Sequence, residues 1–328
     1  MKILVAGGAG YIGSHVALDL SRKGHQPVVL DNLAKGHRGA VLAGKLILGD
    51  IGDAALVQDI LIRERIDAVV HLCAYSLVGE SVTNPSIYFH NNIGNGMAFL
   101  DALIAANVKK IVFSSTAAVF GIPERTPIPE DHPKNPINPY GFSKMAFEGM
   151  MQAYDAAYGL KYVSLRYFNA AGADPEGRIG EAHNPESHLI PIVLQTALGI
   201  RPHIEVYGVD YPTPDGTCIR DYIHVNDLSQ AHLLALQALG DGAESTIYNL
   251  GNGLGYSNRE VIETARKVTG RDIPLKEGPR RPGDPAVLVA SSERIQKELG
   301  WKPEFPALEQ IIATAWKWHQ GHPQGFEA

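Results

Sequence analysis

The stretch Lys2-Ile3-Leu4-Val5-Ala6-Gly7-Gly8-Ala9-Gly10-Tyr11-Ile12-Gly13 decides the fold. An apolar strand-like run leads into glycines spaced Gly7-x-x-Gly10-x-x-Gly13, and a helical pattern follows. Glycines at this spacing allow a tight turn, close approach to a pyrophosphate, and packing of the helix on the strand. The amides at the helix N-terminus favour phosphate groups. A glycine triplet alone is weak, so the strand before it and the helix after it carry the prediction of a dinucleotide-binding loop.

Apolar runs alternate with helical patterns through the first half of the chain. Continuous Val, Ile and Leu content is typical of parallel strands that are covered on both faces. The alternation predicts an α/β fold with a doubly wound parallel sheet (Rossmann-like) and right-handed crossovers. The expected strands are 3–6, 27–30, 46–48, 68–72, 110–114 and 162–167, and the expected helices are about 12–22, 54–65, 92–106 and 139–158.

The pattern changes after Asn169, where Gly, Pro and His become frequent. Residues 189–199 and 222–239 resemble helices, 248–251 resembles a strand that could return to the sheet, and two or three helices follow. We expect an NAD-binding domain over 1–169, completed by segments near 222–251. A smaller α/β substrate domain over 170–328 is expected to be interleaved with it.

Two aspartates end strands beside the glycine loop. Asp31 follows Gly13 by 18 residues, close to the spacing of about 20 for a carboxylate on the adenosine ribose. A carboxylate there repels a 2′-phosphate, which favours NAD over NADP. Asp50-Ile51 ends the third strand and could line the adenine pocket. The alternative, that Asp31 and Asp50 only cap turns, stays open.

Tyr140 and Lys144 lie four residues apart on the predicted helix 139–158, downstream of Ser114-Ser115-Thr116. This spacing puts both side chains on one helix face, a turn apart. Because a nearby ammonium favours the phenolate, Tyr140 is expected to take a proton from an alcohol near neutral pH. Tyr-x-x-x-Lys alone more often reflects packing. Together with the glycine loop it predicts hydride transfer between an alcohol carbon and a nicotinamide.

Composition excludes several classes of protein. The 328 residues are 45% hydrophobic and 20% charged, as in a globular protein of one or two domains. A net charge of -6 does not indicate the basic surface that is typical of nucleic-acid-binding proteins. No apolar run reaches the roughly 18 residues of a membrane span. The two cysteines, Cys73 and Cys218, and the lack of a signal-peptide pattern favour the cytoplasm.

Thirteen histidines raise the question of a metal site. Neither H-E-x-x-H nor a Cys/His cluster occurs, so structural or surface histidines are expected and no metal is predicted. Residues 210–216 superficially resemble a calcium loop but lack its remaining ligand positions. Glu148, one turn after Lys144, is expected to be a solvated helix partner.

Further motifs connect the chain to a known family. The glycine loop, Asp31, Ser-Ser-Thr and Tyr-x-x-x-Lys resemble the extended short-chain dehydrogenase/reductase superfamily. The second half is similar to the UDP-glucose 4-epimerase family in Leu165-Arg166-Tyr167-Phe168-Asn169, Asp210-Tyr211-Pro212-Thr213, Arg220-Asp221-Tyr222-Ile223-His224-Val225, Tyr248-Asn249-Leu250-Gly251 and Arg280-Arg281-Pro282-Gly283-Asp284.

The resemblance implies interconversion of UDP-glucose and UDP-galactose. Resident NAD accepts hydride from C4 of the hexose, the 4-keto sugar rotates about its diphosphate link, and the hydride returns to the other face. Tyr140 would be the base, Thr116 would bind the reacting oxygen, and Lys144 would hold the nicotinamide ribose. The resemblance also implies a homodimer formed through the helices at 92–106 and 139–158.

The same resemblance implies the ligand contacts. Arg220 and Arg281 would hold the diphosphate through paired N–H donors, Asp284 the uridine ribose, and Tyr207 the uracil. The expected cofactor contacts are Gly7, Gly10, Tyr11, Ile12, Gly13, Asp31, Asn32, Asp50, Ile51, Leu72, Cys73, Ala74, Ser76, Asn92, Ser114, Tyr140, Lys144 and Tyr167. The expected substrate contacts are Thr116, Tyr140, Phe168, Asn169, His188, Leu189, Tyr207, Arg220, Arg281, Asp284 and Leu288.

The chain departs from the family pattern at four places. Thr116 replaces a frequent Ser and keeps the hydroxyl. Ala74-Tyr75-Ser76 replaces Gly-Leu-Lys, so a lysine contact to the cofactor is absent or replaced. Ser187-His188-Leu189 replaces Asn-Asn-Leu, so His188 either contacts the diphosphate or caps the helix. Leu288 lies where a bulky Tyr closes the hexose pocket and a small residue opens it, which predicts weak or partial activity on UDP-N-acetylglucosamine.

Two other functions stay open. A nucleotide-sugar 4,6-dehydratase or UDP-glucuronate decarboxylase on this scaffold would need an acid/base group directly after Thr116, where Ala117-Ala118 stands. A non-catalytic nucleotide-binding protein would need neither Tyr140 nor Lys144.

Overall fold

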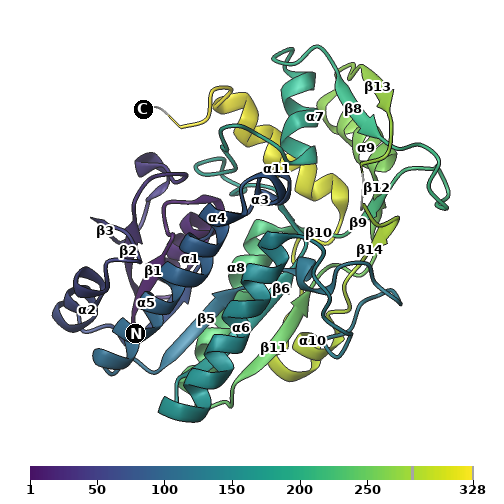
Figure 1. Ribbon diagram of the computed structural model, residues 1–328. Coiled ribbons are helices and arrows are strands. Elements are labelled where there is room, and N and C mark those ends of the chain that lie inside the picture. Colours follow the sequence, from purple (N-terminus) through teal and green to yellow (C-terminus); the bar gives the residue numbers. More distant parts are fainter. Residues whose placement is uncertain (282–283, 327–328) are drawn as a thin grey trace.

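Seven parallel strands form the central sheet, in the order β11-β6-β5-β4-β1-β2-β3 (Figure 1). The computed structural model describes residues 1–281 and 284–326; Pro282 and Gly283 of the Arg280–Asp284 motif lie outside the described residues. Each of the six strands expected in the first half is found within one residue of its predicted bounds. The strands are β1 (Lys2–Ala6), β2 (Gln26–Asp31), β3 (Lys45–Leu48), β4 (Ala68–His71), β5 (Lys110–Ser114), β6 (Lys161–Tyr167) and β11 (Thr246–Leu250).

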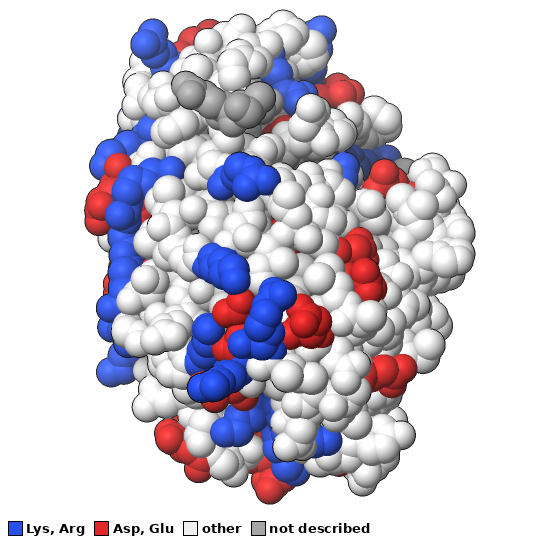
Figure 2. Space-filling view, turned by 90° about the vertical axis from the view of Figure 1, so that its left-hand side faces the viewer, with Lys and Arg blue, Asp and Glu red and all other residues white. Residues whose placement is uncertain are grey.

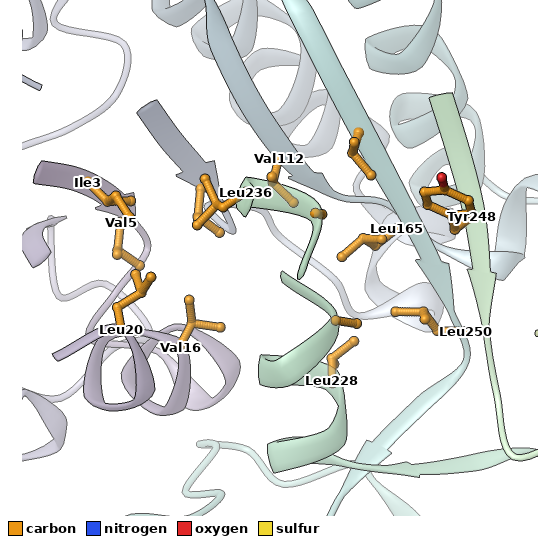
Figure 3. Packing of buried hydrophobic residues seen from close by; sticks show 14 of the residues in the cluster. Ile3, Val5, Val16, Leu20, Val112, Leu165, Leu228, Leu236, Tyr248 and Leu250 are labelled. Atoms are coloured by element: carbon orange, nitrogen blue, oxygen red, sulfur yellow. The ribbon is translucent and has the colours of Figure 1, made fainter. Parts of the chain in front are cut away.

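Both faces of the sheet are buried, which explains the apolar runs. Along β1, Ile3 and Val5 pack with one core cluster, whereas Leu4 and Ala6 pack with the other, as the two-residue period of a strand requires. Helices α1 (Tyr11–Arg22) and α8 (Val225–Gly240) cover the first face. In Figure 3, the side chains of Val16 and Leu20 from α1 lie close to those of Ile3 and Val5. Helices α2 (Ala54–Arg63), α5 (Gly96–Ala105) and α6 (Pro139–Tyr158) cover the second face.

A third core cluster belongs to the second half of the chain. It joins helices α7, α9 and α11 to the strand pair β8–β13, above the sheet in Figure 1. The division into 1–169 and 170–328 stays a prediction. The elements of this part are β7 (Asn169–Ala171), α7 (Leu189–Ala197), β8 (Ile204–Tyr207), β9 (Ile219–Arg220), β10 (Tyr222–His224), β12 (Tyr256–Ser257), α9 (Asn258–Thr269), β13 (Leu275–Gly278), β14 (Val287–Leu288), α10 (Glu293–Leu299) and α11 (Leu308–Gly321).

Two sequence predictions of helices need correction. Residues 222–224 form strand β10, which pairs with β7, and α8 begins only after them because the His224 imidazole accepts the N–H of Asn226 at 3.1 Å. The helix expected over 92–106 is the π-helix η2 (Phe89–Asn95) followed by α5. Short elements that the pattern did not predict are η1 (Arg38–Ala40), α3 (Val78–Thr83), α4 (Pro85–Tyr88) and η3 (Ala117–Phe120).

Charges of both signs are intermingled on the face shown in Figure 2. Glu64 pairs with Lys2 at 3.0 Å and with Lys45 at 2.7 Å. No helix among the described residues is long and apolar enough to cross a membrane.

Candidate active site

The glycine loop between β1 and α1 has room only for glycine at two positions. Gly7 has a positive φ of 85°, and a Cβ there would lie 2.8 Å from the amide nitrogen of Cys73. A Cβ on Gly13 would lie 2.1 Å from the carbonyl oxygen of Gly7. Gly10 is the N-cap of α1, and the first-turn amides of a helix have no partner within it. The loop therefore fits a dinucleotide pyrophosphate held on backbone N–H groups.

We expect Gly13→Ala to weaken NAD binding at least about tenfold and to destabilise the fold by roughly 1–3 kcal/mol, because α1 must move away from β1. Chromatography of the denatured protein measures the NAD that was retained. Thermal unfolding measures the loss of stability. Gly149→Ala is the matched control, since a Cβ there meets nothing within 4 Å. Unchanged cofactor content in Gly13→Ala would contradict the prediction.

Asp31 joins the glycine loop to the end of β2. Its carboxylate accepts the N–H of Ala9 at 3.0 Å and that of Leu33 at 2.8 Å. Each carboxylate oxygen can accept a second bond, so the proposed ribose contact is compatible with this turn-capping role. Asp50 accepts from the Asn32 amide at 2.7 Å and from the Gly52 N–H at 2.8 Å. The predicted residues Asn32 and Asp50 thus lie together at the ends of β2 and β3.

The side-chain amide of Asn92, in the π-helix η2, is hydrogen-bonded to other residues of the protein. Its Oδ1 accepts the N–H of Tyr75, and its Nδ2 donates to the Tyr75 carbonyl and to the Ser143 hydroxyl, each at 3.0 Å. Asn92 therefore connects the segment after β4 with α6, and a direct contact to cofactor or substrate stays a proposal. Leu72 and Cys73, at the end of β4, lie against Gly7.

Thr116, Tyr140 and Lys144 converge where β5 ends and α6 begins. Asn138 caps α6 by accepting the N–H of Gly141 at 2.8 Å, which makes Tyr140 a first-turn residue. Lys144, buried, donates from Nζ to the Ser114 carbonyl at 2.7 Å. Thr116 caps η3 by accepting the N–H of Ala118 at 3.1 Å. Its hydroxyl is also near enough to Tyr140 to lower the pKa of that phenol. The predicted catalytic side chains are therefore brought together.

The expectation that Lys144 eases ionisation of Tyr140 stays a prediction. Burial raises the pKa of Tyr140, and the Thr116 hydrogen bond only partly offsets this. Burial also lowers the pKa of Lys144 to about 7, despite the nearby Glu148 carboxylate. Both groups are desolvated, and the Lys144 ammonium is directed at the Ser114 carbonyl. A phenolate at Tyr140 needs a further positive charge, which an oxidised nicotinamide carries.

We expect Thr116→Val to move the rising limb of the turnover–pH profile to higher pH. Removing a hydrogen bond that lowers the Tyr140 pKa raises that pKa, by up to about one unit for a neutral bond, so the base form is reached at higher pH. The profile of kcat against pH measures the shift. Thr116→Ser keeps the hydroxyl and should retain the original profile; an unmoved limb in Thr116→Val would contradict the assignment.

Glu148 is not solvated, so that prediction is wrong. Glu148 is 2% exposed, and its carboxylate accepts from Nε and Nη2 of Arg166 at 2.8 and 2.6 Å. The Ser115 hydroxyl donates to the same carboxylate at 2.7 Å. The position four residues after Lys144 lies on the same helix face, which here packs against the sheet. The buried pair ties α6 to β6 and to the residue before Thr116.

Phe168 and Leu288 lie beside the segment that follows Thr116. Both pack against the buried cluster Ala117, Val119, Phe120 and Ile128, which follows Thr116 in the chain. Leu288 in β14 pairs with Arg220 in β9. The residue predicted to limit the size of the hexose pocket therefore lies beside a residue predicted to bind the diphosphate. At the end of β6, the Tyr167 phenol hydrogen-bonds the Ser114 hydroxyl.

The predicted nucleotide contacts form two pairs. Arg220 donates from Nη2 to Asp284 Oδ1 at 3.0 Å and from Nη1 to the Pro285 carbonyl at 2.9 Å. The Arg281 guanidinium lies 4.1 Å from the ring centre of Tyr207. Asn169 donates from Nδ2 to the Asp221 carbonyl at 2.8 Å, which connects it to the Arg220 segment.

His188 occupies the N-cap position of α7, but its side chain makes no capping hydrogen bond. The helix-capping alternative is therefore wrong. Its Nδ1 faces the Glu181 carboxylate instead, beside His183 and Glu186. Sequence analysis missed this group, although the spacing Glu-x-His-x-x-Glu-x-His within eight residues was a usable signal. Leu189 is the first residue of α7.

Known proteins resemble this chain over most of its length. Residues 3–251 match the NAD dependent epimerase/dehydratase family. The chain belongs to this family. A UDP-glucose 4-epimerase of Halalkalibacterium halodurans is 55% identical, over 99% of this chain and 98% of that protein.

Solved structures of epimerases resemble the whole chain. One UDP-glucose 4-epimerase structure is 49% identical with a TM-score of 0.98, over 100% of both chains. Another, from Bifidobacterium longum in complex with NAD+ and UDP, is 37% identical with a TM-score of 0.94, over 99% of this chain and 100% of that one. Membership of the NAD dependent epimerase/dehydratase family confirms the predicted Rossmann-like fold and the dependence on NAD.

Proposed function

We propose that this protein interconverts UDP-glucose and UDP-galactose by inverting the configuration at C4 of the hexose. The observation that carries the proposal is the convergence of Thr116, Tyr140 and Lys144 beside a dinucleotide-binding glycine loop. Full-length relatives that carry the name UDP-glucose 4-epimerase support the substrate.

Tyr140 serves as the base and then as the acid. NAD supplies a reversible hydride acceptor when it is bound. The Tyr140 phenolate accepts the proton of the C4 hydroxyl and later returns it, while Thr116 holds the reacting oxygen. Lys144 holds the nicotinamide ribose. Because the reduction in the second half of the cycle reverses the oxidation in the first, no net oxidant is consumed.

Arg220 and Arg281 anchor the substrate by its diphosphate. Arg220 is largely buried and held by Asp284, and Arg281 stacks on Tyr207, so both guanidinium groups are restrained before the ligand arrives. Bidentate N–H donors suit a diphosphate. A diphosphate anchored in this way leaves the 4-keto sugar free to rotate and to present its other face to the cofactor.

The dehydratase and decarboxylase alternatives lack a group that they need. Ala117 and Ala118 follow Thr116 in η3, and neither can donate or accept a proton. The intact proton-transfer residues also argue against a purely binding role.

A direct assay tests the function. The purified protein should convert UDP-galactose to UDP-glucose without added cofactor, and UDP-sugar should produce an absorbance band of reduced nicotinamide. Continuous consumption of added NAD would identify a net dehydrogenase instead, and absence of conversion would refute the proposal.

Leu288 sets the acceptance of larger sugars. We expect weak or partial turnover of UDP-N-acetylglucosamine relative to UDP-glucose, because leucine is intermediate between the residues that close and open the pocket. Leu288→Tyr should remove the N-acetyl activity by roughly 10–200-fold or more, the range for steric discrimination in apolar pockets. Competitive assays of both sugars measure this; equal use of both by the unmodified protein would show that Leu288 imposes no gate.

We propose that the protein is a cytoplasmic homodimer that pairs through α5, α6 and η2. The side chains of Phe89, Met97 and Phe142 are 38%, 50% and 47% exposed on these elements, and apolar groups exposed together mark interfaces. Sedimentation should give a dimer that Phe142→Glu weakens. A monomer at all concentrations would refute the dimer. The cytoplasmic location rests on two free thiols, Cys73 and Cys218.

A further inference from the structure

Four side chains between β7 and α7 form a compact group of metal-ligand type. Glu181, His183, Glu186 and His188 each offer one oxygen or nitrogen, and these atoms lie within 4.8 Å of one another. His183 Nδ1 is 3.0 Å from Glu181 Oε1 and 3.7 Å from Glu186 Oε1. Zinc bonds of about 2.0–2.2 Å put neighbouring ligand atoms roughly 3.3 Å apart, and the two distances from His183 lie on either side of that value.

The two carboxylates of the group are buried side by side. The side chains of Glu181 and Glu186 are only 4% and 3% exposed. Two neighbouring anions out of water require a positive charge among them. His183 Nδ1 is buried and approaches both carboxylates without the geometry of a hydrogen bond to either. A nitrogen and two oxygens that face one point suit coordination of one ion.

The backbone around the group is held from several other elements. The Trp318 indole of α11 donates to the Glu181 carbonyl at 3.1 Å, and a ring nitrogen of His37 lies 2.7 Å from the Ala182 carbonyl. Glu186 Oε1 accepts the N–H groups of Ser187 and His188 at 2.8 and 2.9 Å, which orients its carboxylate. Contacts of this kind fix metal ligands from outside the coordination sphere. The His188 side chain, 46% exposed, leaves a path for an ion to enter.

We propose that Glu181, His183, Glu186 and His188 bind one divalent transition-metal ion of the zinc class. Two imidazoles and two carboxylates are nitrogen and oxygen ligands of the type that zinc accepts, and magnesium prefers an all-oxygen site that retains water. All four positions of a tetrahedral ion are filled by the protein, so the ion is structural. It fixes the 181–188 segment beside Tyr11, whose ring centre lies 6.3 Å from that of His183.

The test measures metal content and stability rather than turnover. Full-length protein without a histidine tag, dialysed against ZnCl₂ and then metal-free buffer, should retain about one zinc per chain by elemental analysis. EDTA should lower the unfolding temperature, and ZnCl₂ but not MgCl₂ should restore it. A folded protein that binds no zinc at micromolar ZnCl₂ would overturn the proposal and leave an ion-free group of imidazolium–carboxylate pairs.

Variants locate the ion. His188→Gln removes an exposed ligand without disturbing a core, and His183→Gln/His188→Gln removes both nitrogens. Both should weaken zinc binding by more than the roughly 10–100-fold that loss of an outer-sphere partner costs. His203→Gln, a partly exposed histidine outside the group, is the matched control and should bind zinc normally. Equal zinc binding by the double variant would show that the ion binds elsewhere and would also overturn the proposal.

Discussion

Tyr140→Phe should lower epimerase turnover by roughly 100–10,000-fold while leaving the bound cofactor in place. The variant removes only the oxygen that is proposed to exchange the C4 proton. The ring is kept, and the glycine loop that holds the dinucleotide lies on other elements. Lys144 remains hydrogen-bonded to the Ser114 carbonyl, so the local fold should persist. Turnover of UDP-galactose, with retained NAD measured on the same sample, separates loss of chemistry from loss of cofactor.

Tyr158→Phe is the matched control for this experiment. Tyr158 is the last residue of the same helix and its side chain is 54% exposed, so the loss of its hydroxyl should not affect turnover. Near-normal rates in Tyr140→Phe would remove Tyr140 from the base role. Loss of NAD together with activity would instead point to a structural defect at the start of α6.

Arg166→Met should destabilise the protein by about 3–5 kcal/mol, the typical cost of leaving one buried ion without its partner. Arg166 is 1% exposed and supplies two of the hydrogen bonds to the Glu148 carboxylate. Without the guanidinium, that carboxylate keeps the Ser115 hydroxyl at 2.7 Å and the Lys134 ammonium at 3.8 Å. Denaturant unfolding measures the change in the free energy of unfolding.

The double variant Glu148→Gln/Arg166→Met should recover much of that loss, because no uncompensated charge remains. Arg63→Met tests an exposed ion pair for comparison. Arg63 and Asp59 are each 55% exposed, so its removal should cost less than about 1 kcal/mol. If Arg166→Met lowers the free energy of unfolding no more than Arg63→Met does, the buried pair does not stabilise the packing of α6 against the sheet.

Local pattern was sufficient to predict the first six strands of the sheet and to place the proposed catalytic residues Tyr140 and Lys144 on one helix. A strand, a glycine turn and a helix occupy consecutive residues, and Tyr140 and Lys144 are related by one helical turn. Such relations depend on spacing alone. The π-helix η2 was not predicted, because its residues have no distinct period and its geometry comes with Asn92 bonds to Tyr75 and Ser143.

Pairings across long stretches of chain could not be predicted in the same way. Spacing put Glu148 on the face of Lys144 but could not show that Arg166, in β6, would lie opposite it. Arg220 and Asp284 were each predicted as ligand contacts, yet their ion pair depends on β14 returning to β9. The Glu181–His188 group is close in sequence, but its convergence depends on α11 and the glycine-loop region packing around it.

The place of β11 has a consequence for synthesis on the ribosome. The edge of β6 is completed only by residues 246–250, and α8, which covers the same end of the sheet, lies at 225–240. A nascent chain that has released residues 1–169 still has an unpaired, apolar strand edge, which is prone to pair with other chains. Translation must therefore continue for about a quarter of the protein's length before that edge is protected. A gene truncated after β6 should yield insoluble product rather than a free nucleotide-binding half.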